Sequence, residues 1–121
     1  MHRLTSLTEL CIQGVDQDLV SFPPEEMLLP TILIKLTIGF FPNLRIISSQ
    51  GLHVLTSLES LRIDDCPKLA SIPDDLPLSL TQLYIYDDCP LLRKKYKPDA
   101  PRYWAKISHI PYIEIGDYYK P

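Results

Sequence analysis

The stretch Leu58-Glu59-Ser60-Leu61-Arg62-Ile63-Asp64-Asp65-Cys66-Pro67-Lys68-Leu69 contains the pattern that decides the fold. Its first half reads apolar-x-x-apolar-x-Ile, and the same half-motif begins at residues 7, 33, 80 and 110 as well as at 58. Consecutive copies begin 26, 25, 22 and 30 residues apart. A self-similarity this regular indicates one structural unit repeated along the chain.

A second half-motif begins eight or nine residues after the start of the first. Three copies of one corner read Phe41-Pro42-Asn43-Leu44, Cys66-Pro67-Lys68-Leu69 and Cys89-Pro90-Leu91-Leu92. A further apolar residue comes three positions later at Ile47 and Ile72, and the first copy ends in the same way, in Leu19-x-x-Phe22. The period is close to that of leucine-rich repeats, about 20–29 residues. We therefore expect a leucine-rich-repeat solenoid of the α/β type, in which short strands stack in parallel.

The predicted strands lie near 7–12, 33–38, 58–63 and 80–85, with a terminal strand near 110–115. The connections between them are rich in proline, for example Pro23-Pro24 and Pro73. Because proline interrupts helices, we expect irregular or 3-10 returns and few regular helices. This divides the chain into four repeats over residues 1–92 and, over 93–121, a basic connecting segment, the terminal strand and a tail.

Two segments carry a specific family resemblance. The units at 58–69 and 76–85 resemble the C-terminal leucine-rich repeats of plant nucleotide-binding leucine-rich-repeat disease resistance proteins, the coiled-coil type especially. The stretch Trp104-Ala105-Lys106-Ile107-Ser108-His109-Ile110-Pro111-Tyr112-Ile113-Glu114-Ile115 is similar to the closing segment of many of those receptors. Tyr96 and Arg102-Tyr103 depart from the pattern, since the family often has a cysteine at the first place and a glycine and an acidic residue at the second.

The resemblance implies a protein-binding module in plant defence, the distal fragment of an intracellular immune receptor that recognises pathogen effectors. Its implied partners are an effector protein or the nucleotide-binding domain of the same receptor. The four glycines form no Gly-rich phosphate loop, so no ATPase activity is transferred to this chain. An alternative is a truncated structural remnant without independent function. The first repeat begins directly at Leu4 and Leu7, and an open apolar edge there predicts self-association.

Composition narrows the function classes further. Leu and Ile supply 33 of the 121 residues, which is enough to build a core, and the formal net charge of -3 predicts no general attraction to nucleic acid. One segment differs: six basic residues and one acid give residues 93–106 a net charge of +5, which leaves -8 for the rest of the chain. We interpret this run as a solvated loop that docks against acidic turns. No apolar stretch is long enough to span a membrane.

The cysteines and histidines suggest no catalytic or metal site. An odd count of three cysteines and the absence of a secretory leader favour a reducing compartment, and we expect a cytoplasmic protein. Cys66 and Cys89 occupy the same corner of successive repeats, where Asn or Cys is expected to hydrogen-bond the turning backbone. Cys11 falls on an outward strand position and is a candidate exposed thiol. We expect no enzyme activity and no cofactor.

The remaining candidate surface is the outward row of the sheet, which alternation along each strand defines. Mixed charge with tyrosines is typical of protein recognition, although an ordinary solvated strand face has the same composition. We expect Trp104 to cover the last repeat. If it is buried, its replacement by alanine should lower the free energy of unfolding by about 3–5 kcal/mol. The predicted protein-binding row consists of Glu9, Gln13, Lys35, Thr37, Glu59, Arg62, Asp64, Gln82, Tyr84, Tyr86, Tyr112 and Glu114.

Overall fold

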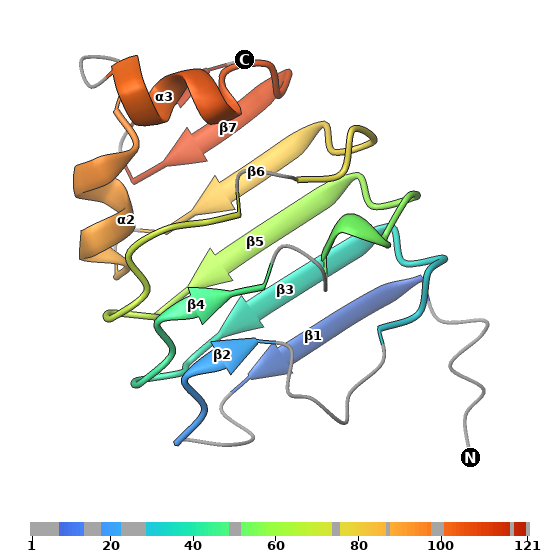
Figure 1. Ribbon diagram of the computed structural model, residues 1–121. Coiled ribbons are helices and arrows are strands. Elements are labelled where there is room, and N and C mark those ends of the chain that lie inside the picture. Colours follow the sequence, from blue (N-terminus) through green and yellow to red (C-terminus); the bar gives the residue numbers. More distant parts are fainter. Residues whose placement is uncertain are drawn as a thin grey trace.

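The chain forms an α/β structure dominated by one mostly parallel sheet (Figure 1). The computed structural model describes residues 8–13, 18–22, 29–48, 52–73, 76–86, 88–97, 101–116 and 118–120. The main sheet has the order β1-β3-β5-β6-β7-β8, and only β8 runs antiparallel to its neighbour. Its strands are β1 (Glu9–Gln13), β3 (Lys35–Gly39), β5 (Ser60–Asp64), β6 (Gln82–Ile85), β7 (Tyr112–Ile115) and β8 (Tyr118–Lys120).

The five copies of the sequence pattern become the five parallel strands, so the prediction of short parallel strands is confirmed. The second apolar residue of each copy pairs with its equivalent in the next strand, as does the isoleucine that follows two positions later. These positions form two rows on the inner face, and all of them are buried except half-buried Leu10. The rows are Leu10, Leu36, Leu61, Leu83 and Ile113, and Ile12, Ile38, Ile63, Ile85 and Ile115.

Each strand begins two residues later than predicted. The first apolar residue of the last four copies lies in a tight turn, where its N–H donates to the carbonyl three residues earlier. For example, the amide of Leu58 donates to Leu55 at 3.1 Å, and the side chain of Leu58 is fully buried below the sheet. A residue whose amide is used in its own turn cannot donate to the neighbouring strand, which is why the ladder starts later.

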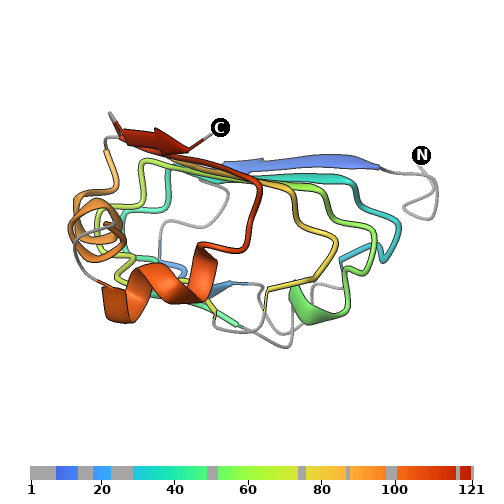
Figure 2. The same cartoon turned by 90° about the horizontal axis from the view of Figure 1, so that it is seen from above.

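The second half-motif builds a second layer under the main sheet. There β2 (Ser21–Phe22) and β4 (Ile46–Ile47) pair in parallel, with Phe22 opposite Ile47. Figure 2 shows the main sheet along one side of the molecule and β2, β4 and α3 along the other. The core lies between the layers and includes fully buried Phe22, Phe41 and Leu44. Proline in the returns therefore does not prevent short extended pairing here.

Two helices form where the sequence predicts a basic connecting loop, so that prediction is wrong. They are α2 (Pro90–Lys95) and α3 (Pro101–Ile107). Each begins at a proline. The first helical turn tolerates proline, which has no backbone N–H, because an N–H at that place would have no acceptor within the helix. Leu92, Tyr96 and Ile107 are buried, so the helical return covers the core beside β6 and β7. Trp104 is half-buried against the same core.

The side chain of Tyr96 takes the place of a strand in the second layer. The residue is 2% exposed, and its hydroxyl accepts a hydrogen bond from the amide of Ile72 at 3.1 Å and lies 3.5 Å from the carbonyl of the same residue. Ile72 is the equivalent of Phe22 and Ile47, whose backbones pair in β2 and β4. A buried backbone amide without a partner is costly, and the tyrosine hydroxyl supplies that partner.

The repeated corners are closed by buried sulfur atoms. The amide of Cys66 donates to the Sγ of Cys89 at 3.4 Å, while the thiols donate to the carbonyls of Asp64 and Ile63 at 3.4 and 3.8 Å. Both thiols are fully buried. The side-chain hydrogen bond with Cys66 and burial raise the pKa of the Cys89 thiol far above its ordinary value, so this sulfur is a structural group and a poor nucleophile.

Candidate functional site

The candidate site is the exposed face of the main sheet, on the side away from β2, β4 and α3 (Figure 2). Strand alternation and parallel register arrange the outward side chains in rows across the strands. The central row contains Thr37, Arg62 and Tyr84 at directly paired positions, continued by Cys11 on β1 and Glu114 on β7. The row at the amino ends of the strands contains Glu9, Lys35, Ser60, Gln82 and Tyr112, and the row at the carboxyl ends contains Gln13, Gly39, Asp64 and Tyr86.

Five of these side chains form one connected cluster over β5, β6 and β7, which we call the Arg–Tyr cluster. The guanidinium of Arg62 lies 4.5 Å from the ring centroid of Tyr84 and donates to the hydroxyl of Tyr86 at 3.1 Å. The ring of Tyr84 contacts that of Tyr112 with centroids 5.5 Å apart, and the hydroxyl of Tyr112 donates to Glu114 at 2.9 Å. Long side chains held by each other lose less conformational freedom when a partner binds.

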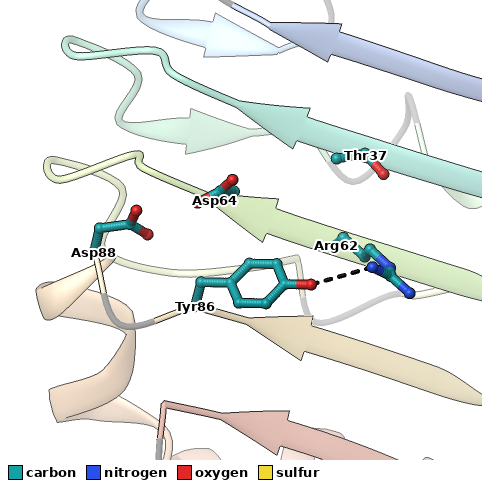
Figure 3. Close-up of a pocket in the computed structure, with 5 residues that line it drawn as sticks. All are labelled: Thr37, Arg62, Asp64, Tyr86 and Asp88. Carbon is teal, nitrogen blue, oxygen red and sulfur yellow. Dashed lines mark hydrogen bonds between the residues drawn. The ribbon is translucent and has the colours of Figure 1, made fainter.

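Two hollows meet at Arg62 on this face. One, of about 440 Å³, is lined by Thr37, Arg62, Asp64, Tyr86 and Asp88 (Figure 3). Figure 3 shows Arg62 extending toward the hydroxyl of Tyr86, while Asp64 and Asp88 lie at the opposite end. The other hollow, of about 450 Å³, shares Thr37 and Arg62 and extends to β1; its other lining residues are Glu9, Leu10, Cys11, Lys35 and Ser60.

An acidic corner borders the first hollow where β5 and β6 end. Burial, the charge of Asp88, a side-chain hydrogen bond with Asp88 and the charge of Asp65 raise the pKa of the Asp64 carboxyl. Asp88 also accepts a hydrogen bond from the backbone amide of Asp65 at 2.9 Å. Asp65 has a φ of 47°, a left-handed conformation that aspartate adopts more readily than most residues. The Asp88 carboxylate thus stabilises the corner that follows β5 by accepting this hydrogen bond, although the neighbouring carboxylates repel one another.

Most of the predicted row lies on strands of this face, and one member lies just before its strand. Glu59 is exposed but lies one residue before β5, and its carbonyl accepts hydrogen bonds from the amides of Thr81 and Gln82 at 2.9 Å. The place of Glu59 in the binding surface therefore stays a prediction. Ser60 is the residue of the strand ladder at this end of β5, because residues 60, 62 and 64 share one face of the strand. Cys11 is exposed as predicted.

The sequence reasoning did not assign Asp88 to this surface. Asp88 follows β6 at the place that Asp65 holds after β5, since both precede a Cys-Pro pair. A residue-by-residue alignment of the two corners would have indicated that Asp88 lies beside this surface. The contacts of the Arg–Tyr cluster, in contrast, depend on side-chain directions that the alignment does not contain.

The described part of the chain offers little for other kinds of chemistry. Within it, no group of three or more His, Cys, Asp or Glu side chains could hold a metal ion. The helices that are described there are all too short or too polar to cross a membrane. The exposed face presents aromatic rings around a central arginine, with carboxylates at the edge. This composition suits contact with another macromolecule.

Comparison with known proteins gives one relationship. No protein-family model matches the chain, and no solved structure matches it. The chain is 38% identical over 116 residues to the protein of Arabidopsis thaliana named "Putative disease resistance protein At3g14460". The match covers 95% of this chain and 8% of that protein, so the chain spans a small part of the relative's length. Nearly the whole sequence is therefore similar to a segment of a protein named for plant disease resistance.

Proposed function

We propose that this chain is a leucine-rich-repeat solenoid that binds proteins in plant defence, as the distal part of an intracellular immune receptor that recognises pathogen effectors. The observation that carries the proposal is the Arg–Tyr cluster on the exposed face of a sheet whose strands repeat one sequence pattern. The exposed face is the binding surface in this proposal, and an effector protein is the partner. The expected compartment is the cytoplasm.

The regular advance of the strands supports the solenoid. Each parallel strand is one copy of the sequence pattern, and the pairing joins equivalent residues without slippage from β1 to β7. The second layer repeats in the same way, since Phe22 pairs with its equivalent Ile47. Stacking of equivalent residues from successive copies of one sequence unit is the defining property of repeat architectures.

The chemistry of the exposed face supports protein recognition. Arginine and tyrosine are among the residues that contribute most to binding free energy at protein interfaces, especially near the centre of a contact. Arg62 lies at the centre of this face, between the two hollows, and contacts Tyr84 and Tyr86. The similarity to a protein named for disease resistance supports the defence role.

A direct binding assay tests the proposal. The purified chain is immobilised and screened by biolayer interferometry against a panel of effector proteins from plant pathogens. Any effector that binds is then tested against Arg62→Glu and Tyr84→Ala, which change the centre of the exposed face. The matched control is Arg45→Glu, because Arg45 is exposed beside β4 in the second layer and its reversal changes the net charge by the same amount as that of Arg62.

We expect both face variants to weaken effector binding at least tenfold, equivalent to about 1.4 kcal/mol, and Arg45→Glu to leave it within threefold. Equal binding by all variants would place the contact elsewhere and contradict the assignment of the exposed face. A correctly folded chain that binds no effector in a broad panel would favour the truncated remnant. Circular dichroism of each variant establishes that the fold is retained.

A further inference from the structure

We propose that the outer surface of α2 and the residues that follow it form a second interaction site, which binds an acidic segment of a protein partner. This surface, called here the basic corner, consists of Arg93, Lys94 and Lys97 around a hollow of about 210 Å³, with Pro90 at its rim. Lys94 and Lys97 are exposed, and Arg93 is half-buried. The hollow is large enough for one or two carboxylate groups and is surrounded by cations.

The basic corner and the exposed face lie on different sides of the molecule. The strands of the main sheet point toward α2, which lies at their carboxyl ends, while α3 lies in the layer opposite the main sheet (Figures 1 and 2). None of the residues that line the basic corner lines either hollow of the exposed face. An effector on the exposed face and an acidic segment at the basic corner would therefore contact different residues.

The base of this surface is ordered by aromatic contacts. Buried Tyr96 packs edge-on against Tyr103, with ring centroids 6.1 Å apart. The Nζ atoms of Lys95 and Lys106 lie 4.5 and 5.8 Å from the centroid of the Tyr103 ring. Two ammonium groups beside one ring raise the positive potential next to the basic corner. The backbone that presents Lys94 and Lys97 is thus anchored to the core through Tyr96.

The distribution of charge favours a short acidic segment over an extended polyanion. Residues 93–106 carry a net charge of +5, whereas the rest of the chain carries -8. Asp88 stands two residues before Pro90, and it belongs to the acidic corner with Asp64 and Asp65. A membrane plane or a long nucleic acid laid over α2 would also approach those carboxylates and be repelled. A peptide of a few acidic residues can contact the cations alone.

The test measures binding of a fluorescein-labelled tetraglutamate peptide to the full chain by fluorescence anisotropy, at about 0.05 and about 0.5 M salt. The paired variants Lys94→Glu/Lys97→Glu reverse two charges at the basic corner. The control Arg45→Glu/Lys68→Glu reverses two charges at exposed positions elsewhere, so both variants have the same net charge. Lys94→Gln/Lys97→Gln, which removes charge without adding acid, replaces the first variant if charge reversal prevents folding.

We expect the peptide to bind at low salt, to bind at least tenfold more weakly at high salt, and to lose at least tenfold in affinity with the Lys94/Lys97 variants. The control is expected to stay within threefold of the unmodified chain, and a tetraglutamine peptide is expected not to bind. The inference is overturned if the two pairs of variants weaken binding equally, or if the peptide does not bind. Tighter binding of phosphatidylserine vesicles or of a single-stranded oligonucleotide would overturn it as well, because it would assign the surface to another class of partner.

Discussion

The hydroxyl of Tyr96 gives a sharp test of how the repeat ends. Tyr96→Phe keeps the buried ring but removes the hydroxyl that accepts a hydrogen bond from the amide of Ile72 and lies near its carbonyl. The amide of Ile72 then remains buried and without that partner. Leaving a buried donor unsatisfied costs about 1–3 kcal/mol, and we expect a loss of about 2 kcal/mol in the free energy of unfolding.

The expected loss can be converted to a melting temperature. Unfolding entropy is about 2.1 cal/mol/K per residue, which for 121 residues makes 1 kcal/mol equivalent to about 4 °C. Tyr96→Phe is therefore expected to lower the Tm by about 8 °C in a thermal melt followed by circular dichroism. Amide hydrogen exchange is expected to accelerate at Ile72, because its amide has lost the hydrogen bond that protected it.

A matched control separates the hydrogen bond from the general effect of removing a hydroxyl. Tyr84→Phe makes the same change on the exposed face, where water can solvate the neighbouring groups, and is expected to change the free energy of unfolding by no more than about 0.5 kcal/mol. The reasoning is refuted if Tyr96→Phe has the same melting temperature as the unmodified chain and unchanged exchange at Ile72. Equal losses in both variants would refute it too.

Three further outcomes are expected. Trp104→Ala is expected to cost about 2 kcal/mol in urea unfolding, less than the cost at a fully buried tryptophan, because the side chain is half-buried; a loss above about 4 kcal/mol would contradict this. Asp64→Asn is expected to stabilise the chain at pH 7. The pKa of Asp64 is raised in the fold, so its ionisation lowers the free energy of unfolding as the pH rises through that pKa. The stabilisation by Asp64→Asn is therefore expected to vanish below the ordinary pKa of 3.8. A stabilisation that persists in acid would contradict repulsion between the carboxylates as its cause. In native protein, Ellman's reagent is expected to titrate Cys11 rapidly and buried Cys66 and Cys89 only after unfolding, whereas three fast thiols would contradict the burial.

The sequence by itself determined the five parallel strands of the main sheet, to within two residues at their start, together with their inner face. An apolar-x-x-apolar-x-Ile pattern that returns at a nearly constant interval leaves one efficient way to bury all its copies, which is to stack them in register. For this reason the repeated pattern alone assigns Leu36, Leu61 and Leu83 to one buried row. The same logic placed Thr37 and Arg62 on the outward face.

The tertiary structure decided the features that depend on contacts between repeats. Helices α2 and α3 replace the predicted loop, because Leu92, Tyr96 and Ile107 gain burial only when the core of the earlier repeats is already in place. The hydrogen bond between Arg62 and Tyr86 joins residues 24 positions apart, and so does the bond between Tyr96 and Ile72. Local sequence encodes the period of burial, whereas the direction of a long side chain depends on which neighbours the fold brings beside it.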